Sequence, residues 1–351
     1  MRYVTKVFAL LLAGMLLLCG CALTDILILP PADTDGPEET GDPVTDGAVQ
    51  TEADGPAEIE EEHFASAVEE KAAKRIDAAI ARAIELLDTF HEEPIAILEC
   101  DDSARPKQRD LLKDPLSVEI YDTLLRQMSA YGDLHYSEKD SPGLDLFCIC
   151  VSAVDALRID RNDLFLYADV KITGSEYTLS YYMPGDGLSS PCDDREAIRR
   201  EVELCDAVVT RILAKMPEGL TAHQKCAYFA FVLAAGTEYD HREDYPLFDY
   251  PAHAALVWGT AVCSGYAQAF TRLCREAGIS CWYCRGTVRG PLGDGRHAWA
   301  MLDTEDGPIY VDPTWYDVPE ISTHYRDGKE QYLFMTQEEF DENGCTVDSR
   351  Q

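Results

Sequence analysis

Residues 260–278 read TAVCSGYAQAFTRLCREAG, and this stretch decides the expected fold. From Tyr266 onward its apolar side chains recur at three- and four-residue steps, which predicts an amphipathic helix with Gly278 as its C-terminal cap. Cys263 would then lie near the N-terminus of this helix. There the unpaired backbone N–H groups and the helix dipole favour the thiolate, the nucleophilic form of cysteine. Because a buried core cysteine is the commoner origin of an isolated motif, a nucleophile needs partners elsewhere in the chain.

A β-hairpin is expected further along the chain. Residues 297–302 and 308–311 read as two strands on either side of a polar turn. If the residues that flank the turn pair with each other, His297 faces position 313 and lies one step from Asp312. Loop length can shift this register by one or two residues. In either case a carboxylate is expected beside an imidazole.

These residues have the chemistry of a nucleophilic triad. An imidazole can take the proton of a thiol, and a neighbouring carboxylate fixes the tautomer and stabilises the imidazolium that forms. We therefore predict Cys263 as the nucleophile, His297 as the base and Asp312 as the orienting group. A lone histidine is more often structural, but here three roles occur in suitable local structure.

The sequence patterns around the triad resemble those of the bacterial transglutaminase-like superfamily. They are VCSGYA at residues 262–267, HAW at 297–299 and YVDPTW at 310–315. The resemblance extends upstream to EYD at 238–240 and downstream to YLFMT at 332–336, which resembles the final strand of the family. It implies an α+β, papain-like core in which the nucleophile helix packs on an antiparallel sheet. It also implies cysteine-dependent acyl transfer without a metal or an organic cofactor.

The resemblance leaves the reaction open. An acyl-enzyme that reacts with water makes a peptidase or amidase, whereas one that reacts with an amine makes a transglutaminase. The substrate would be a peptide or protein. By analogy the backbone N–H of Cys263 supplies one oxyanion donor, and Tyr239, Trp258 and Gln268 are candidates for a second. The alternative is a non-catalytic protein that uses the same cleft to bind peptide or glycan.

The N-terminus predicts export. Arg2 and Lys6 precede an apolar run at residues 7–18 that is too short to span a membrane as a mature helix. The following residues, Leu-Cys-Gly-Cys at 18–21, resemble the bacterial lipobox, in which Cys21 would carry the lipid. An uncleaved anchor helix is the alternative. Either reading places the protein at the outer face of the cell membrane, where cell-wall peptides are possible substrates.

The remaining chain is expected to form three parts. An acidic tether without Lys or Arg covers residues 22–62, an N-terminal α+β region covers 63–195, and the catalytic domain covers 196–345. Periodicity predicts helices at 64–98, 121–128, 195–216 and 222–235, and strand-like runs at 146–153, 164–172, 177–182 and 279–288.

Charge and cysteine content exclude some classes of protein. The formal net charge of −34 argues against nucleic acid as a partner, because binding would need a clustered basic surface. Among 13 cysteines, Cys281 and Cys284 form a CxxC pair, but they lie in an expected strand and no second pair completes a zinc site. We expect them in a disulfide or in the core. Cys148 and Cys150 are expected to point the same way along another strand.

Overall fold

The computed structural model describes most of the chain from residue 56 onward. Described are residues 56–100, 107–132, 134–137, 143–163, 167–173, 176–183, 190–192, 194–242, 251–290, 293–317, 325–326, 329–330 and 332–350. The expected signal peptide with Cys21 and most of the expected tether lie outside these residues. Within them, no helix combines the length and the apolar character needed to cross a membrane.

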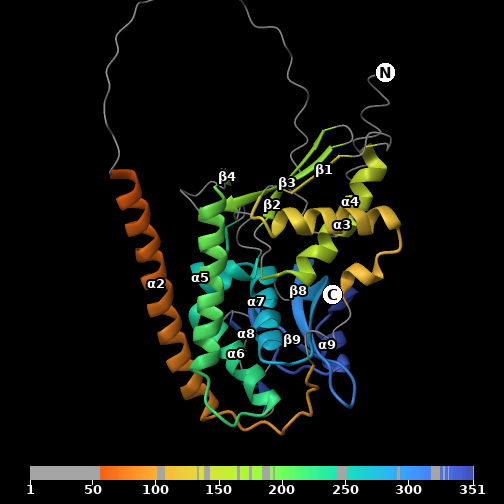
Figure 1. Ribbon diagram of the computed structural model, residues 1–351. Helices are drawn as coiled ribbons and strands as arrows, with labels where there is room; N and C mark the ends of the chain where they lie inside the picture. The colour runs from red at the N-terminus through yellow and green to blue at the C-terminus, as the bar shows by residue number, and fades with distance from the viewer. Residues whose placement is uncertain are drawn as a thin grey trace, which may run out of the picture.

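The elements form two groups that α5 (Arg195–Ala214) connects (Figure 1). The first group contains η1 (Gln108–Leu111), α3 (Pro115–Met128), β1 (Leu134–Ser137), α4 (Gly143–Asp160), β2 (Tyr167–Thr173), β3 (Glu176–Met183) and β4 (Ser190–Cys192). The helices of the second group are α2 (Pro56–Leu87), α6 (Ala222–Gly236), η3 (Ala254–Trp258), α7 (Cys263–Glu276), α8 (Pro313–Asp317) and α9 (Gln337–Glu342). Its strands are β5 (Glu238–Tyr239), β6 (Thr260–Ala261), β7 (Cys281–Gly290), β8 (Gly293–Leu302), β9 (Ile309–Val311), β10 (Tyr325–Arg326), β11 (Lys329–Glu330) and β12 (Thr346–Arg350).

Helix α2 belongs to the core of the second group. It begins at Pro56, within the expected tether, and proline suits the first turn of a helix. Ile76, Ile80 and Ala83 recur at helical spacing and are buried against the cluster that contains α6 and α7. This packing crosses the expected boundary between residues 195 and 196.

The expected strand at residues 146–153 is wrong, because this stretch lies in helix α4. A continuous apolar run fits a buried strand or a buried helix equally well, and packing decides between them. Cys150, Val154 and Leu157 are buried at helical spacing in the same cluster as side chains of α3. The expectation that Cys148 and Cys150 point the same way depended on the alternation of side chains in a strand, which does not apply to a helix.

Helix α5 contributes to both cores. Its first half buries Ile198 and Val202 with α3 and α4, and its second half buries Val209 and Ile212 with α2 and α6. The expected bounds of α5 and α6 agree with the structure within two residues, which is the usual scatter of helix ends. Helix α7 begins at Cys263, three residues before the periodic stretch that the sequence showed from Tyr266. A capping box between Thr221 and Gln224 begins α6.

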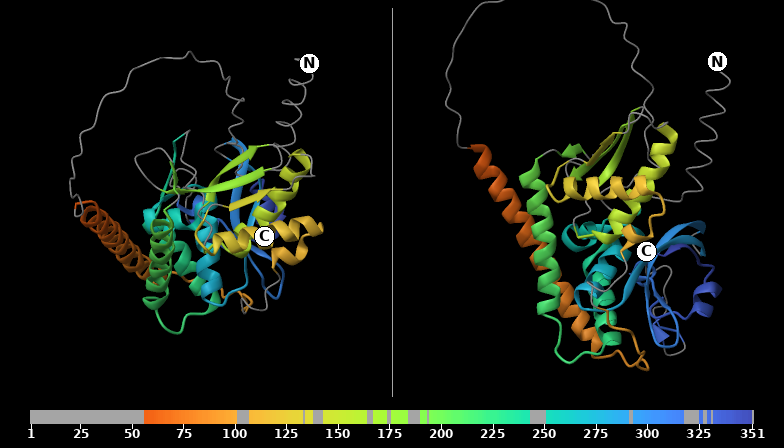
Figure 2. Two further views of the ribbon diagram at one scale, coloured as in Figure 1. Left: turned by 45° about the horizontal axis from the view of Figure 1, so that its top comes forward. Right: turned by 45° about the vertical axis from the view of Figure 1, so that its right-hand side comes forward.

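The second group contains a four-stranded antiparallel sheet in the order β12-β7-β8-β9. Helix α7 packs between this sheet and α6 (Figure 2). Leu302 pairs with Ile309 rather than with Pro308, so the hairpin register is shifted by one residue from the simplest expectation. The expected strand at 279–288 corresponds to β7.

The expectation of a final strand at residues 332–336 is also wrong. Only Met335 bridges to Tyr310, whereas Tyr332 and Phe334 have positive φ angles of 69° and 57°, which interrupt extended backbone. The last strand of the sheet is β12, which pairs with β7.

Gly286 on β7 allows β12 to approach the sheet. A Cβ at this position would lie 1.8 Å from the carbonyl oxygen of Thr346 and 2.9 Å from the Trp299 ring. We expect Gly286→Ala to lower the free energy of unfolding by about 1–3 kcal/mol, because β12 has to move. Gly295→Ala on β8 is the matched control, since a Cβ there meets nothing within 4 Å. Urea denaturation of both variants tests this, and equal stabilities would contradict it.

Candidate active site

Cys263 is the first residue of α7. Val262 has extended backbone at the N-cap position and no side chain caps the helix, so the first N–H groups of the helix remain available to an anionic sulfur. The Cys263 side chain is half-buried, whereas the helix residues that follow it are buried. It packs against Ala267 of its own helix and Tyr283 of β7. This is the environment that the sequence predicted for a nucleophile.

His297 on β8 and Asp312 form a buried pair. The imidazole Nε2 lies 2.7 Å from Asp312 Oδ2, as the hairpin predicted despite its shifted register. The other carboxylate oxygen, Oδ1, accepts backbone N–H groups of Thr314 at 3.1 Å and Trp315 at 3.0 Å. One aspartate thus caps α8 with one oxygen and holds the imidazole with the other.

Two further contacts fix this pair. The Asp312 backbone N–H donates to the Tyr332 carbonyl at 2.8 Å, which ties the aspartate to the segment with the positive φ angles. The Trp315 ring stacks on the imidazole with centroids 5.1 Å apart and an interplanar angle of 25°. An indole face can stabilise an imidazolium by a cation–π interaction. The sequence analysis quoted Trp315 only as part of a motif, and its role depends on the fold.

The electrostatics favour a charged histidine. Burial acts to lower the pKa of His297, but the charge of Asp312, the interaction with Cys263 and the hydrogen bonds to both raise it to about 10. Because Asp312 occupies Nε2, Nδ1 is the nitrogen left for the thiol. A protonated imidazole beside a thiol at a helix N-terminus favours the thiolate–imidazolium pair.

Tyr283 and Ser264 lie next to the nucleophile. The Ser264 and Tyr283 hydroxyl oxygens are 3.1 Å apart, and Gln268 Nε2 donates to Ser264 Oγ at 2.9 Å. Burial raises the pKa of the Tyr283 phenol, which the nearby guanidinium of Arg285 opposes. Arg285 in turn lies 3.3 Å from Asp155 of α4, so the first group of elements reaches the sheet beside the active site.

The three candidate oxyanion donors differ in position and in hydrogen bonding. The Gln268 amide already donates to Ser264. Tyr239 lies on β5, next to the strand that leads to Cys263, with its ring 6.4 Å from that of Tyr266. Trp258 ends η3, and its indole Nε1 is buried without a hydrogen-bond partner among the described residues.

Tyr266 and Asp317 form a contact that sequence reasoning missed. The Tyr266 hydroxyl donates to Asp317 at 2.5 Å and so joins the nucleophile helix to α8, which Asp312 begins. Burial raises the pKa of Asp317 to about 6, although the hydrogen bond from Tyr266 acts to lower it. Both residues lie within or beside the quoted motifs, but their pairing depends on the tertiary structure.

Cys281 and Cys284 are buried on opposite faces of β7. Cys284 packs in the cluster that includes Trp299, whereas Cys281 lies in the main core with Cys226 and Cys274. This geometry assigns both residues to the core and rules out a redox dithiol formed by the pair. Among the described residues, no group of three or more His, Cys, Asp or Glu side chains could hold a metal ion.

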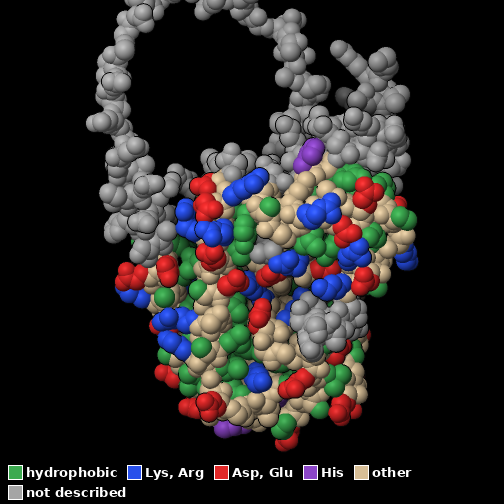
Figure 3. Space-filling model, in the orientation of Figure 1, with side chains coloured by type: hydrophobic (Ala, Val, Ile, Leu, Met, Phe, Trp, Pro, Cys, Tyr) green, Lys and Arg blue, Asp and Glu red, His purple; other side chains and the backbone are tan. Residues whose placement is uncertain are grey.

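The face in Figure 3 carries acidic and basic side chains close together rather than one continuous basic patch. This distribution applies to that face only.

Residues 209–318 match the family model for the transglutaminase-like superfamily, and this range includes all three predicted triad residues. The fold is α+β with a papain-like core in which the nucleophile helix packs on the antiparallel sheet. These residues are therefore similar to the transglutaminase-like superfamily. No curated protein matches the chain.

Two solved structures share similarity with the chain. One is a proposed cysteine protease from Cytophaga hutchinsonii, with 13% identity, 50% of this chain and 57% of that chain covered, and a TM-score of 0.28. The other is a TGase with 15% identity and a TM-score of 0.28, and the match covers 51% of this chain and 50% of the TGase. The chain therefore spans about half the length of each. The family assignment stands on the sequence match and on the geometry of the core.

We expect Cys263 to react with iodoacetamide faster than the other thiols near pH 6, where an ordinary thiol with a pKa of about 8.5 is almost fully protonated. Because the pKa of His297 is raised, its positive charge is present at acidic and neutral pH and is lost only near pH 10. Cys100 is the matched control, since it is the other half-buried thiol among the nine whose burial is described. Peptide mapping by mass spectrometry measures both rates. Equal, slow labelling would contradict the ion pair.

Proposed function

We propose that the protein is a cysteine-dependent acyl-transfer enzyme that acts on amide bonds of peptides or proteins through Cys263, His297 and Asp312. The observation that carries the proposal is the buried His297–Asp312 pair, which interacts with a half-buried cysteine at a helix N-terminus. A purely structural cysteine would need neither the exposure nor the charged partner.

The geometry supports a two-step reaction. The Cys263 sulfur attacks the amide carbonyl, and backbone N–H groups at the start of α7 stabilise the oxyanion. When the C–N bond breaks, His297 gives its proton to the leaving amine and an acyl-enzyme thioester remains. Water or a second amine then attacks the thioester and gives its proton to His297. The C–S bond breaks, the acid or the new amide leaves, and the thiolate–imidazolium pair is restored. Asp312 keeps the imidazole in the orientation that both steps need.

A peptide library and intact-mass analysis test this function. Hydrolysed peptides would identify a peptidase or amidase, and amine-crosslinked products would identify a transglutaminase. A Cys263→Ala sample run in parallel identifies products that depend on the nucleophile. Binding of peptide or glycan by the wild type, with neither product from any substrate, would contradict catalysis and favour the binding alternative.

We also propose that Cys21 anchors the protein to the outer face of the cell membrane, where cell-wall peptides and surface proteins are within reach. The support is the apolar run and lipobox-like Leu-Cys-Gly-Cys at residues 18–21. Each buried methylene of an acyl chain contributes about 0.8 kcal/mol, so several chains hold a protein firmly without a spanning helix.

Replacing Cys21 with Ser is expected to abolish lipid attachment and to shift the protein from the membrane to the soluble fraction. Fractionation with immunoblotting measures this shift, and the mass of the mature N-terminus shows whether lipid is present. Cys19→Ser is the matched control and is expected to remain at the membrane. Retention of the unprocessed Cys21→Ser protein in the membrane would support an anchor helix.

A further inference from the structure

We infer that Arg75 of α2 is a positioning residue for the nucleophile, because it holds the segments that lead into the paired strands β5 and β6, and β6 is the strand directly before Cys263. The inference rests on the proposed function in so far as Cys263 is the nucleophile. Arg75 lies outside the range that matches the family model, so it is not part of the site that the motifs define.

The Arg75 guanidinium donates hydrogen bonds to four backbone carbonyls. Nη1 bonds to the carbonyl of Gly236 and lies 3.4 Å from that of Ala255. Nη2 donates to Leu256 at 2.5 Å and to Val257 at 3.0 Å. These carbonyls lie at the end of α6 and in η3, where the last carbonyls of a helix lack intrahelical partners and carry the negative end of the dipole. The planar guanidinium, with N–H donors on both terminal nitrogens, can bind both segments at once.

The two segments that Arg75 holds are the starts of a small parallel sheet. After Gly236 the chain enters β5, and after η3 it turns at Gly259 into β6. Backbone N–H groups of Glu238 and Asp240 donate to the carbonyls of Gly259 at 2.9 Å and Ala261 at 3.0 Å. Val262 and Cys263 follow directly. The position of the sulfur therefore depends on where η3 and α6 end relative to each other.

Two glycines next to Arg75 leave space for its guanidinium, because a larger side chain at either position would lie against it. Gly259 has a positive φ of 73°, and a Cβ there would lie 2.6 Å from Arg75 Nε. A Cβ at Gly236 would lie 3.3 Å from Nη1. Burial lowers the pKa of Arg75 to about 10, which leaves it charged at neutral pH, and Tyr266 of the nucleophile helix acts in the opposite direction.

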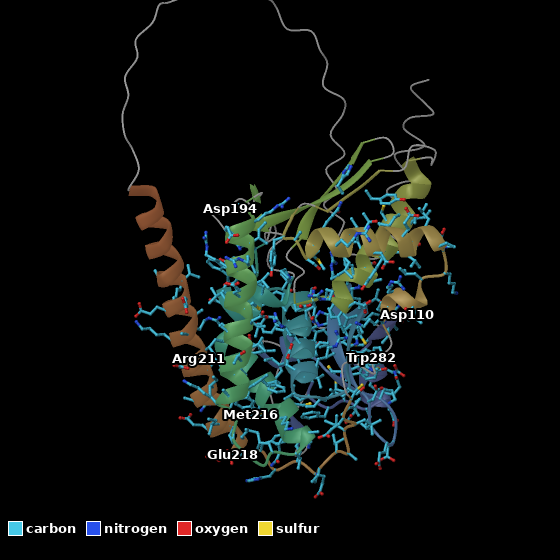
Figure 4. The ribbon with its side chains drawn as sticks, in the orientation of Figure 1. Asp110, Asp194, Arg211, Met216, Glu218 and Trp282 are labelled. Carbon is cyan, nitrogen blue, oxygen red and sulfur yellow. The ribbon has the colours of Figure 1, made fainter. Side chains whose placement is uncertain are left out.

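Other contacts attach α2 without involving these carbonyls. The Asp77 carboxylate accepts hydrogen bonds from Arg211 of α5 at 2.6 Å and from Lys215, directly after α5, at 2.5 Å. Figure 4 shows Arg211 on α5 beside α2. The apolar side chains of α2 are buried independently in the core. Loss of the Arg75 guanidinium should thus loosen the β5–β6 segment more than it detaches the helix.

The test compares Arg75→Met, which keeps length and apolar contact, with Arg75→Lys and with Arg82→Met. Arg82 lies on the same helix, and among the described residues it makes an exposed ion pair with Glu85 and no other contact of this kind, so its variant is the matched control. We expect Arg75→Met to slow labelling of Cys263 near pH 6 and to lower kcat, each by on the order of 10- to 100-fold, with a smaller effect on KM. Arg75→Lys should show a partial loss, and added guanidinium ion at non-denaturing concentration should partly restore Arg75→Met.

A second measurement does not depend on the proposed function. Hydrogen exchange of the Glu238 and Asp240 amides should speed up in Arg75→Met, while exchange in α9 stays unchanged. If wild-type Cys263 itself labels slowly, the proposed function fails, and the exchange result still decides the role of Arg75. Wild-type exchange and labelling in a folded Arg75→Met protein would overturn the inference. If Arg75→Met does not fold, Arg75→Lys decides by the same criteria.

Discussion

Replacing Cys263 with alanine is expected to abolish turnover while the protein keeps its fold. The substitution removes the atom that forms the acyl-enzyme, and loss of a nucleophile from a triad lowers kcat by on the order of a million-fold. The fold should persist because alanine is a good helix former, the side chain is half-buried, and the helix begins without a side-chain cap.

The measurement is kcat/KM on the substrate that the peptide library yields, with circular dichroism to confirm folding. Cys100→Ala is the matched control, because its backbone N–H bonds to Gly278 at the opposite end of α7. That variant should keep nearly full activity. Near-normal turnover in folded Cys263→Ala would refute the assignment of the nucleophile. A Cys263/His297 double variant should be no worse than the single one, because the triad acts as a unit.

Asp312→Asn is expected to lower kcat by about 10⁴-fold with little effect on stability. The asparagine oxygen can still accept the N–H groups of Thr314 and Trp315 and so keep the cap of α8. Its amide nitrogen would then face Nε2 of His297 as a donor. The imidazole would have to carry its proton on Nδ1, towards the thiol, and could no longer accept the thiol proton.

This variant also changes the pH dependence in a defined direction. The charge of Asp312 is a principal cause that raises the pKa of His297 to about 10. Without that charge the pKa falls, so the imidazolium is lost at lower pH and fast labelling of Cys263 should disappear from neutral pH. Rates of labelling and kcat/KM measured from about pH 5 to pH 10 test this. Normal turnover in Asp312→Asn would place the orienting role on another residue.

Asp312→Ala separates the two roles of the residue. It removes both the partner of His297 and the cap of α8, so its free energy of unfolding should fall by about 1 kcal/mol relative to Asp312→Asn. Chemical denaturation of the two variants measures this difference. Equal stabilities would show that the cap contributes little.

Local sequence was sufficient to predict the helix that begins near Cys263, the hairpin and the placement of Asp312 beside His297. Helix periodicity, the Thr221 capping residue and Gly278 act within a few residues of the chain, so they can be read without the fold. Asp312 was placed beside His297 even though the hairpin register was wrong by one residue, because the aspartate lies just beyond β9 and faces the imidazole in the structure.

Packing decided the elements whose pattern was ambiguous. The apolar run of α4 suits either a strand or a helix, and its burial with α3 selects the helix. The segment at 332–336 is apolar as a strand would be, but the backbone turns at Tyr332 and Phe334, and β12 takes the place at the edge of the sheet. Such choices depend on partners that are distant along the chain.

The tertiary structure alone shows how the site is held in place. Arg75 binds carbonyls that lie 161 to 182 residues away, and Tyr266 reaches Asp317 across 51 residues. From sequence alone, a charged side chain on an amphipathic helix is predicted to be solvent-exposed, because its distant partners are not known. The reactive groups are encoded in short motifs because their chemistry is local, whereas their positions depend on contacts that form only when distant segments of the chain pack together.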